Sequence, residues 1–285
     1  MTLEGTNTWV VGTGPALVID PGPDDEDHVE AVRAEAGAVG AILLTHRHPD
    51  HAPGAAPLAA ATGARVYAWR PEPEESGLRP GQEFTSGDGV ILVAVHTPGH
   101  TPDHVVFFAP DARSLFTGDA VLGRGTSVID PPEGDVAAYL RSLDAMAALH
   151  PRTIYPGHGP AVWSAMEKLA EYRTHREERE RQVLAAIADG AHSPEEIVPA
   201  VYGGYAAELH ALAARSVLAH LLKLEREGRA ARVGPPRDNR FEVSTPADCR
   251  RCGRPAMPRS TLCRRCSTEL LQEAPTSEND QGAST

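Results

Sequence analysis

The chain has 285 residues, 41% of them hydrophobic and 23% charged, which suits one or two folded domains and excludes wholesale disorder. Its net charge of -12 argues against a generic nucleic-acid binder, because a phosphate backbone attracts a basic surface. No apolar run reaches the ~20 residues that span a bilayer, and the N-terminus lacks the basic and apolar parts of a signal peptide. We therefore expect a cytoplasmic protein without membrane contact.

Short apolar runs alternate with helical segments in the first half of the chain. Residues 7–12 and 16–20 are predicted to pair as strands around a turn, and residues 25–37 to form a helix with acidic residues in its first turn. A helix is also predicted at 135–149, and strands at 41–45, 64–69, 90–96, 104–110, 114–119 and 153–159. Several of these strands end in a loop that carries His or Asp, where layered α/β proteins place their chemistry.

The pattern changes to longer helices from about residue 161. Ser193, Pro194 and Glu196 have the spacing of a capped helix start. The predicted order is three helices and a hairpin, at 161–190, 193–203, 207–228, 230–234 and 240–244. This order is typical of a winged helix, with a helical cap and a hairpin as the alternative. The polar residues 269–285 are predicted to be a disordered tail.

Three histidines and an aspartate crowd the segment THRHPDH at residues 45–51. Neutral imidazole binds borderline metals such as zinc, and a carboxylate can join or bridge. His46 and His48 are two residues apart after an apolar strand, and alternate residues of an extended segment project the same way. Both can therefore reach one metal, whereas Asp50 and His51 in the next turn can face a second one.

One such segment cannot complete two coordination shells, but three other loops offer further ligands. His100 follows Gly99, Asp119 comes directly after an apolar strand, and His158 lies between two glycines. A lone histidine is usually a surface residue or a hydrogen-bonded core residue. That interpretation weakens here, because several candidates share the same context of a strand followed by a glycine-containing loop.

The segments THRHPDH, TPGHT, TGD and PGHG occur in this order, and with them the chain resembles the metallo-β-lactamase superfamily over roughly residues 3–160. The resemblance implies an α/β fold, a four-layer αββα sandwich with a two-metal site at one edge of its sheets. Carried over by position, it implies a first metal on His46, His48 and His100, a second on Asp50, His51 and His158, and a bridge by Asp119.

A hydrolase with two zinc ions, or with other divalent metals, is the activity that this resemblance implies. Two close cations lower the pKa of a bridging water, and the resulting hydroxide attacks an electrophilic centre. Asp50 and Asp119 are the expected catalytic residues, with Asp50 orienting the hydroxide. His104 is expected to have a structural role, and contact with substrate or support of a ligand is the alternative.

Four cysteines cluster near the C-terminus with the spacing C-x2-C-x10-C-x2-C, at Cys249, Cys252, Cys263 and Cys266. Four thiolates in two such pairs predict a tetrahedral structural Zn2+. Redox activity is the competing interpretation, but a βαβ context for it is missing. The predicted organisation is a catalytic domain at 1–160, a winged helix at 161–246, a zinc ribbon at 247–268 and the tail at 269–285.

Three hypotheses compete for the function. The first is hydrolysis of a small-molecule ester, thioester or lactone; glyoxalase II-like enzymes share TPGHT but carry a different C-terminal region. The second is cleavage of single-stranded RNA, because the motifs followed by a winged helix resemble the β-lactamase-like protein 2 group, which includes an endoribonuclease. The third is a non-catalytic nucleic-acid- or protein-binding module, which the full ligand set disfavours. We expect a small-molecule substrate, and the winged helix is expected to wall the cleft or to form a homodimer interface.

Overall fold

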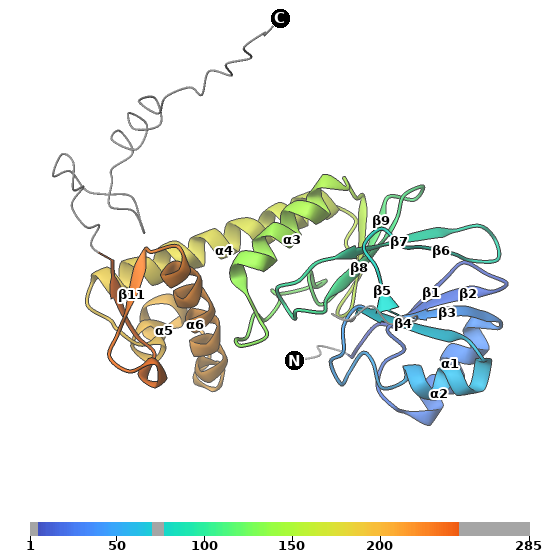
Figure 1. The fold of residues 1–285 in the computed structure, drawn as a ribbon, viewed down its shortest axis with the longest axis horizontal. Coiled ribbons are helices and arrows are strands. Elements are labelled where there is room, and N and C mark those ends of the chain that lie inside the picture. Colours follow the sequence, from blue (N-terminus) through green and yellow to red (C-terminus); the bar gives the residue numbers. More distant parts are fainter. Residues whose placement is uncertain (1–4, 70–76, 245–285) are drawn as a thin grey trace, which may run out of the picture.

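The protein is described by a computed structural model that covers residues 5–69 and 77–244 (Figure 1). Two lobes are visible, and the long helix α4 (Ala165–Ala188) runs from one to the other. The predicted zinc ribbon, with Cys249, Cys252, Cys263 and Cys266, and the predicted tail lie outside the described residues. Within the described ranges, no helix is long and apolar enough to cross a membrane.

The larger lobe begins with a five-stranded sheet in the order β1-β2-β3-β4-β5. β1 is antiparallel to β2, whereas β2 to β5 run parallel; the connections from β2 to β3 and from β3 to β4 are helical, as expected for parallel neighbours. The strands are β1 (Trp9–Val11), β2 (Ala16–Ile19), β3 (Val39–Leu43), β4 (Arg65–Trp69) and β5 (Gly77–Leu78). Helices α1 (Glu26–Ala36) and α2 (Ala55–Thr62) pack on the outer face of this sheet.

A second five-stranded sheet has the order β10-β9-β8-β7-β6 and faces the first. Its strands are β6 (Glu83–Thr85), β7 (Ile91–His96), β8 (Val105–Ala109), β9 (Ser114–Gly118) and β10 (Thr153–Pro156). Helix α3 (Val136–Ala148) and the first half of α4 cover its outer face. The four layers are therefore helices, sheet, sheet and helices, which confirms the predicted αββα sandwich.

Strand alternation explains why the central strands are apolar at every position. Leu17 of β2 contributes to the core between the sheets, whereas its neighbour Val18 packs under α1 and α2. In the same way, Phe107 of β8 lies between the sheets and Phe108 lies under α3 and α4. Both faces of these strands are buried, so they lack the polar positions that a half-exposed strand would have.

The smaller lobe has its own core and confirms the winged helix. It contains α5 (Pro194–Tyr202), a 3-10 turn (Ala207–Leu209), α6 (His210–Arg226), β11 (Ala230–Val233), a second 3-10 turn (Pro236–Asp238) and β12 (Arg240–Val243). The predicted cap is present, because the Ser193 side chain accepts from the Glu196 N–H with Pro194 at the first position. Val183 of α4, Ile197, Leu221 and Phe241 form part of the buried core.

The fold differs from the sequence prediction in several places, including the short strands β5 and β6, which were not predicted. Helix α2 was not predicted, because its sequence AAPLAAAT has no polar face to give a helical period. The long helix begins at Ala165 rather than at residue 161, because Val162 forms a bridge with Ile154 at the edge of the second sheet. That helix serves both lobes, since Leu169 packs in the larger lobe and Val183 in the smaller one.

His220 of α6 is buried where this helix packs against α4. It is 1% exposed, and neither ring nitrogen has a hydrogen-bond partner in the described part of the chain. Burial, and then the positive charge of Arg176, lowers the pKa of His220 to about 3. In the unfolded chain the pKa is about 6.5, so between these values the unfolded state binds more protons. His220 therefore makes the fold less stable as the pH falls through this window.

The variant His220→Leu is expected to remove this acid sensitivity. After chelation of bound metals, the free energy of unfolding should fall less steeply from pH 6.5 to pH 4 than in the wild type, by up to roughly 3 kcal/mol. Denaturant titrations at several pH values measure the difference. The exposed His150, replaced by Asn, is the matched control and should keep the wild-type slope. Parallel pH profiles for wild type and His220→Leu would contradict the assignment.

Candidate metal centre

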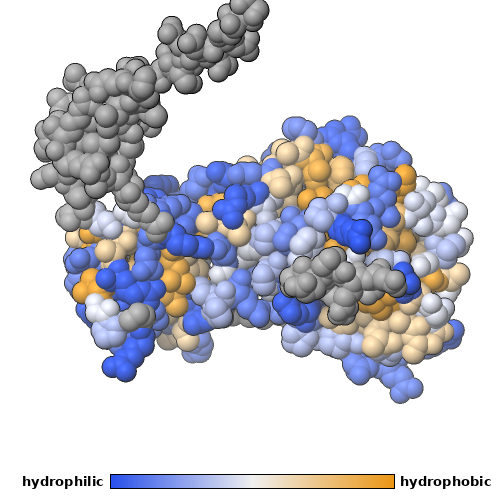
Figure 2. Space-filling view, in the orientation of Figure 1, coloured by the Kyte–Doolittle hydropathy of each residue, from blue (hydrophilic) through white to orange (hydrophobic). Residues whose placement is uncertain are grey.

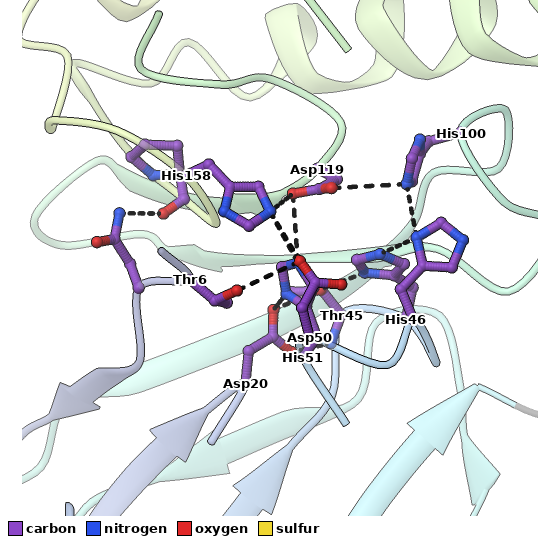
Figure 3. A network of polar contacts seen from close by, with 12 residues as sticks. Thr6, Asp20, Thr45, His46, Asp50, His51, His100, Asp119 and His158 are labelled. Atoms are coloured by element: carbon purple, nitrogen blue, oxygen red, sulfur yellow. Dashed lines mark hydrogen bonds and ion pairs between the residues drawn. The ribbon is translucent and has the colours of Figure 1, made fainter. Parts of the chain in front are cut away.

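The candidate site lies at one edge of the sandwich, where strands of both sheets end (Figure 3). The segment after β3 carries four of its side chains, and the loops after β7, β9 and β10 each carry one more. The structure brings together all seven residues that the sequence predicted as ligands, namely His46, His48, Asp50, His51, His100, Asp119 and His158. Their roles as ligands stay predictions.

The first ligand group consists of His46, His48 and His100. His46 Nε2 lies 2.9 Å from His48 Nδ1, and His100 Nε2 lies 3.1 Å from the same atom. Together with an oxygen of Asp119, the donor atoms of this group all lie within 4.8 Å of one another. His46 and His100 are buried, whereas His48 is half-buried. His48 therefore offers Nδ1 to a metal, and the other two histidines offer Nε2.

The second ligand group consists of Asp50, His51 and His158. His158 Nε2 lies 3.2 Å from Asp50 Oδ2, and His51 Nε2 lies 3.5 Å from the same oxygen. The two histidine Nε2 atoms are 3.3 Å apart. Thr6 donates a hydrogen bond of 3.3 Å to Asp50 Oδ2 and so fixes the orientation of this carboxylate. The three donors converge on one point from two different loops (Figure 3).

Asp119 lies between the two ligand groups, with one oxygen toward each. Its Oδ2 is 3.7 Å from His100 Nε2, whereas its Oδ1 is 3.4 Å from His51 Nε2 and 3.3 Å from His158 Nε2. Oδ1 is buried and has no hydrogen-bond partner among the described residues. Burial raises the pKa of Asp119, but the adjacent rings of His158 and His51 outweigh it and hold the pKa well below its ordinary value. The carboxylate is therefore ionised and placed to bridge two cations.

The ring nitrogens that point away from the centre each face an oxygen, which fixes how the histidines are presented. These pairs are His46 Nδ1 with Thr45 Oγ1 at 3.0 Å, His51 Nδ1 with Asp20 Oδ2 at 2.9 Å, His100 Nδ1 with the Val128 carbonyl at 2.7 Å, and His158 Nδ1 with the Gly5 carbonyl at 2.9 Å. The Thr45 hydroxyl already donates to Asp20, so it accepts from His46. All four outer nitrogens therefore carry a proton, and in its neutral, metal-binding form each ring turns an Nε2 lone pair inward.

The atoms that face one another in this centre are imidazole nitrogens and carboxylate oxygens. Such electron-rich atoms repel one another, so the arrangement suits metal ions bound between them. Two nitrogen lone pairs 3.3 Å apart, as in His51 and His158, repel unless a cation or a proton lies between them. Tetrahedral zinc with bonds of ~2.0–2.1 Å places its ligand nitrogens roughly 3.3 Å apart. Burial lowers the pKa of His51, but the carboxylates of Asp20 and Asp119 raise it to about 10, so a metal must displace a proton there.

Asp20 is a supporting residue that the sequence interpretation missed. It ends β2 and is 1% exposed, and its Oδ1 accepts the Thr45 N–H at 2.7 Å while its Oδ2 accepts the Thr45 hydroxyl at 2.6 Å. The same Oδ2 accepts from His51, so one carboxylate fixes both the start of the ligand segment and a ligand ring. The available signal was an apolar strand that ends in aspartate, as in the segment that contains Asp119.

His104 supports the backbone of the candidate ligand Asp119, and it is not among the described residues that line the cleft over this centre. Its side chain is fully buried, its Nε2 accepts the Asp119 N–H at 3.2 Å, and its Nδ1 lies 3.1 Å from Thr97 Oγ1. The nearby Gly99 has φ +142°, and a Cβ there would lie 2.4 Å from the Tyr139 Cα. Glycine is therefore needed to bring the loop that carries His100 against α3.

A cleft of about 560 Å³ opens over the two ligand groups. The residues that line it include His48, Asp119 and His158 of the ligand groups, and Leu212 and Arg215 from α6 of the winged helix. Its wall is the segment of residues 122–133, which includes the cis peptide bond between Pro131 and Pro132. Residues of the winged helix therefore line this cleft, as one of the two roles predicted for that domain requires.

Buried and interlobe contacts hold this wall segment in place. Arg215 of α6 pairs with Asp130 at 2.5 Å and also donates to the Pro131 carbonyl. Arg176 of α4 is 3% exposed and donates to the Ser127 carbonyl. The neighbouring Val128 carbonyl orients His100. Helices α4 and α6 therefore both help to position His100, because both bind the short segment that contains Val128.

This combination of an αββα sandwich and a clustered His/Asp centre defines the class of protein: the chain belongs to the metallo-β-lactamase superfamily, which its residues 1–158 match, and it is a hydrolase of that superfamily. Residues 193–237 match the β-lactamase-associated winged helix domain. The match to the superfamily covers all seven candidate ligands.

The chain is also similar to individual members of the superfamily. The chain is 35% identical over 271 residues to the β-lactamase-like protein 2 homolog of Drosophila melanogaster, covering 86% of this chain and 90% of the relative. It is 34% identical over 232 residues to an atrochrysone carboxyl ACP thioesterase of Aspergillus fumigatus, covering 73% and 72%. A metallo-β-lactamase family protein from Thermus thermophilus has a similar structure, with a TM-score of 0.69, 25% identity and coverage of 84% and 93%.

Proposed function

We propose that this protein is a dinuclear zinc hydrolase that cleaves a small-molecule thioester, ester or lactone. The observation that carries the proposal is the position of Asp119, with one carboxylate oxygen toward each ligand group. His46, His48 and His100 would hold one metal, and Asp50, His51 and His158 the other. Both groups border the same cleft, so a carbonyl bound there lies beside both.

Two bound divalent metals would supply Lewis acidity, which lowers the pKa of water and stabilises negative charge on an oxygen of the substrate. The chain's own contribution is to orient its ligands and to handle the proton. Asp50 is suited to the proton step, because its side chain is 30% exposed toward the cleft whereas that of Asp119 is 15% exposed. Asp50 would hold the proton of the attacking water and release it to the leaving group.

The charge of the cleft supports a small acyl substrate over a nucleic acid. Asp130 and Glu133 line the wall, and Arg215 is the only Lys or Arg among the described residues that line the cleft. Arg215 is itself paired with Asp130. A phosphate backbone would meet little net positive charge from the protein here. The similarity to a named ACP thioesterase agrees with an acyl–sulfur bond as the target.

Cleavage of single-stranded RNA is the alternative, supported by the resemblance to the β-lactamase-like protein 2 group. A side-by-side assay separates the two: purified protein is incubated with a panel of thioesters and lactones and with a single-stranded RNA, each alongside Asp119→Ala. We expect turnover of at least one acyl substrate and its loss in Asp119→Ala. RNA cleavage that depends on Asp119, without acyl hydrolysis, would overturn the substrate assignment.

The predicted zinc ribbon provides a separate test of the C-terminal segment. Replacing Cys249 and Cys263 by Ser leaves only two of four thiolates, which cannot hold a tetrahedral zinc firmly. We expect metal analysis of this double variant to find one zinc fewer per chain, with hydrolysis of the acyl substrate retained. Loss of the other metals in the same variant would show that the ribbon is not an independent module.

A further inference from the structure

A second hollow adjoins the cleft at Arg215 and lies in the winged helix. This α5–α6 groove has a volume of about 380 Å³ and contains Pro194, Val198 and Pro199 on one side and Ala211, Ala214 and Leu218 on the other. Arg215 lines both the groove and the cleft over the ligand groups. Figure 2 shows hydrophobic patches among charged residues on the lobe that holds these helices.

The groove offers hydrophobic contact to a ligand that extends from the cleft. Along α6 it runs from Ala211 to Leu218, a rise of about 10 Å at 1.5 Å per residue. Most of its lining consists of alanine, valine, leucine and proline side chains, which favour hydrocarbon over polar groups, and Glu195, His210 and Asn239 also line it. A substrate with a reactive carbonyl above the ligand groups can therefore gain binding energy by laying an apolar extension along this path.

Arg215 lines both hollows, and its side chain can adopt a different rotamer. Its side chain is 45% exposed, and that of its partner Asp130 is 48% exposed. An ion pair with this exposure contributes little to stability, so a different rotamer costs mainly the hydrogen bond that Arg215 donates to the Pro131 carbonyl. The arginine stem is itself apolar and can cover a hydrocarbon segment while the guanidinium stays in water.

From these two hollows, which share Arg215 as a lining residue, we infer that the protein takes a thioester or ester whose acyl part is apolar and several carbons long, and that this acyl part passes Arg215 and lies in the α5–α6 groove. The inference rests on the proposed function and specifies its substrate class. In the reaction, an oxygen of water forms the new C–O bond, the C–S or C–O bond to the leaving group breaks, and the leaving group takes a proton. The products are the free acid and a thiol or alcohol.

A series of N-acetylcysteamine thioesters with acetyl, butanoyl, octanoyl and dodecanoyl groups tests the inference on the full-length protein. Complete burial of one CH2 is worth about a fourfold change in affinity, and a surface groove gives less. We therefore expect kcat/KM to rise by about tenfold or more from butanoyl to octanoyl. Ala214→Phe, which fills the groove, should lower kcat/KM for octanoyl by about tenfold more than it does for acetyl.

Controls separate this result from misfolding and from other occupants of the groove. Ala211→Phe, at an exposed position of the groove, should give the same selective loss, whereas Ala185→Phe, exposed on α4 outside both hollows, should leave the whole series unchanged. Equal rates at all chain lengths, or equal losses in Ala214→Phe, would overturn the inference and leave the proposed function standing. A groove that instead binds a second copy would show as a dimer disrupted by Ala214→Phe without altered length dependence. Absence of all thioester hydrolysis would overturn the proposed function itself.

Discussion

Asp119→Asn is expected to lower kcat/KM by about 10²–10³-fold or more, the range associated with removing one preorganised electrostatic group from an active site. Asparagine matches the shape of aspartate, but it has one carbonyl oxygen and an NH2 group that cannot bind a metal. Because Oδ1 faces His51 and His158 while Oδ2 faces His100, one ligand group must lose its shared donor. Both the activity and the occupancy of one metal should therefore fall.

Steady-state kinetics and metal analysis of the same preparation measure the two effects together. Asp111→Asn is the matched control, since Asp111 is exposed in a turn. This substitution makes the same change of charge away from the centre. The control should keep wild-type kinetics and metal content. Full activity of Asp119→Asn with two metals bound would show that this carboxylate does not bridge.

Asp20→Asn is expected to weaken binding of the metal on the second ligand group by about 10–100-fold, the usual effect of losing an outer hydrogen-bond partner of a ligand. The substitution keeps the side-chain shape, and asparagine tolerates the positive φ of 49° at this position. Its NH2 group, however, would face His51 Nδ1, which now donates to Oδ2. The ring would then move its proton to Nε2 and block that lone pair.

Metal titration with a chelating competitor measures this affinity, and circular dichroism checks the fold. Asp88→Asn is the control, because Asp88 caps a turn through Ser86 and Thr13 far from the ligand segment. Loss of activity in Asp20→Asn that excess metal restores would agree with a positioning role. Unchanged metal affinity would show that Asp20 does not set the tautomer of His51.

Much of the site could be predicted from the sequence, because its side chains lie in segments that follow strands. His46, His100, Asp119 and His158 each come after an apolar run, and the ends of neighbouring strands meet at one edge of a sandwich. The sandwich itself was predicted from the resemblance of the motifs to the metallo-β-lactamase superfamily, and continuously apolar strands such as β8, which are buried on both faces, agree with it. These features depend on local pattern and on spacing, which a single sequence displays.

Other parts depend on contacts that no local pattern encodes. The Val128 carbonyl orients His100, but a backbone oxygen has no residue signature. Arg215 reaches the cleft only because α6 docks beside it, and its partner Asp130 is distant in the sequence. Charged residues on a helix face or in a loop are normally solvated, so neither Arg215 nor Asp130 stood out from the other charged residues of its segment.

X-ray diffraction with anomalous scattering at the zinc absorption edge, on crystals of the metal-loaded protein, tests the central claim most directly. We predict two peaks at this centre, one among His46, His48 and His100 and the other among Asp50, His51 and His158, each within bonding distance of one oxygen of Asp119. A single peak at the centre, or two peaks of which one lacks contact with Asp119, would contradict the account.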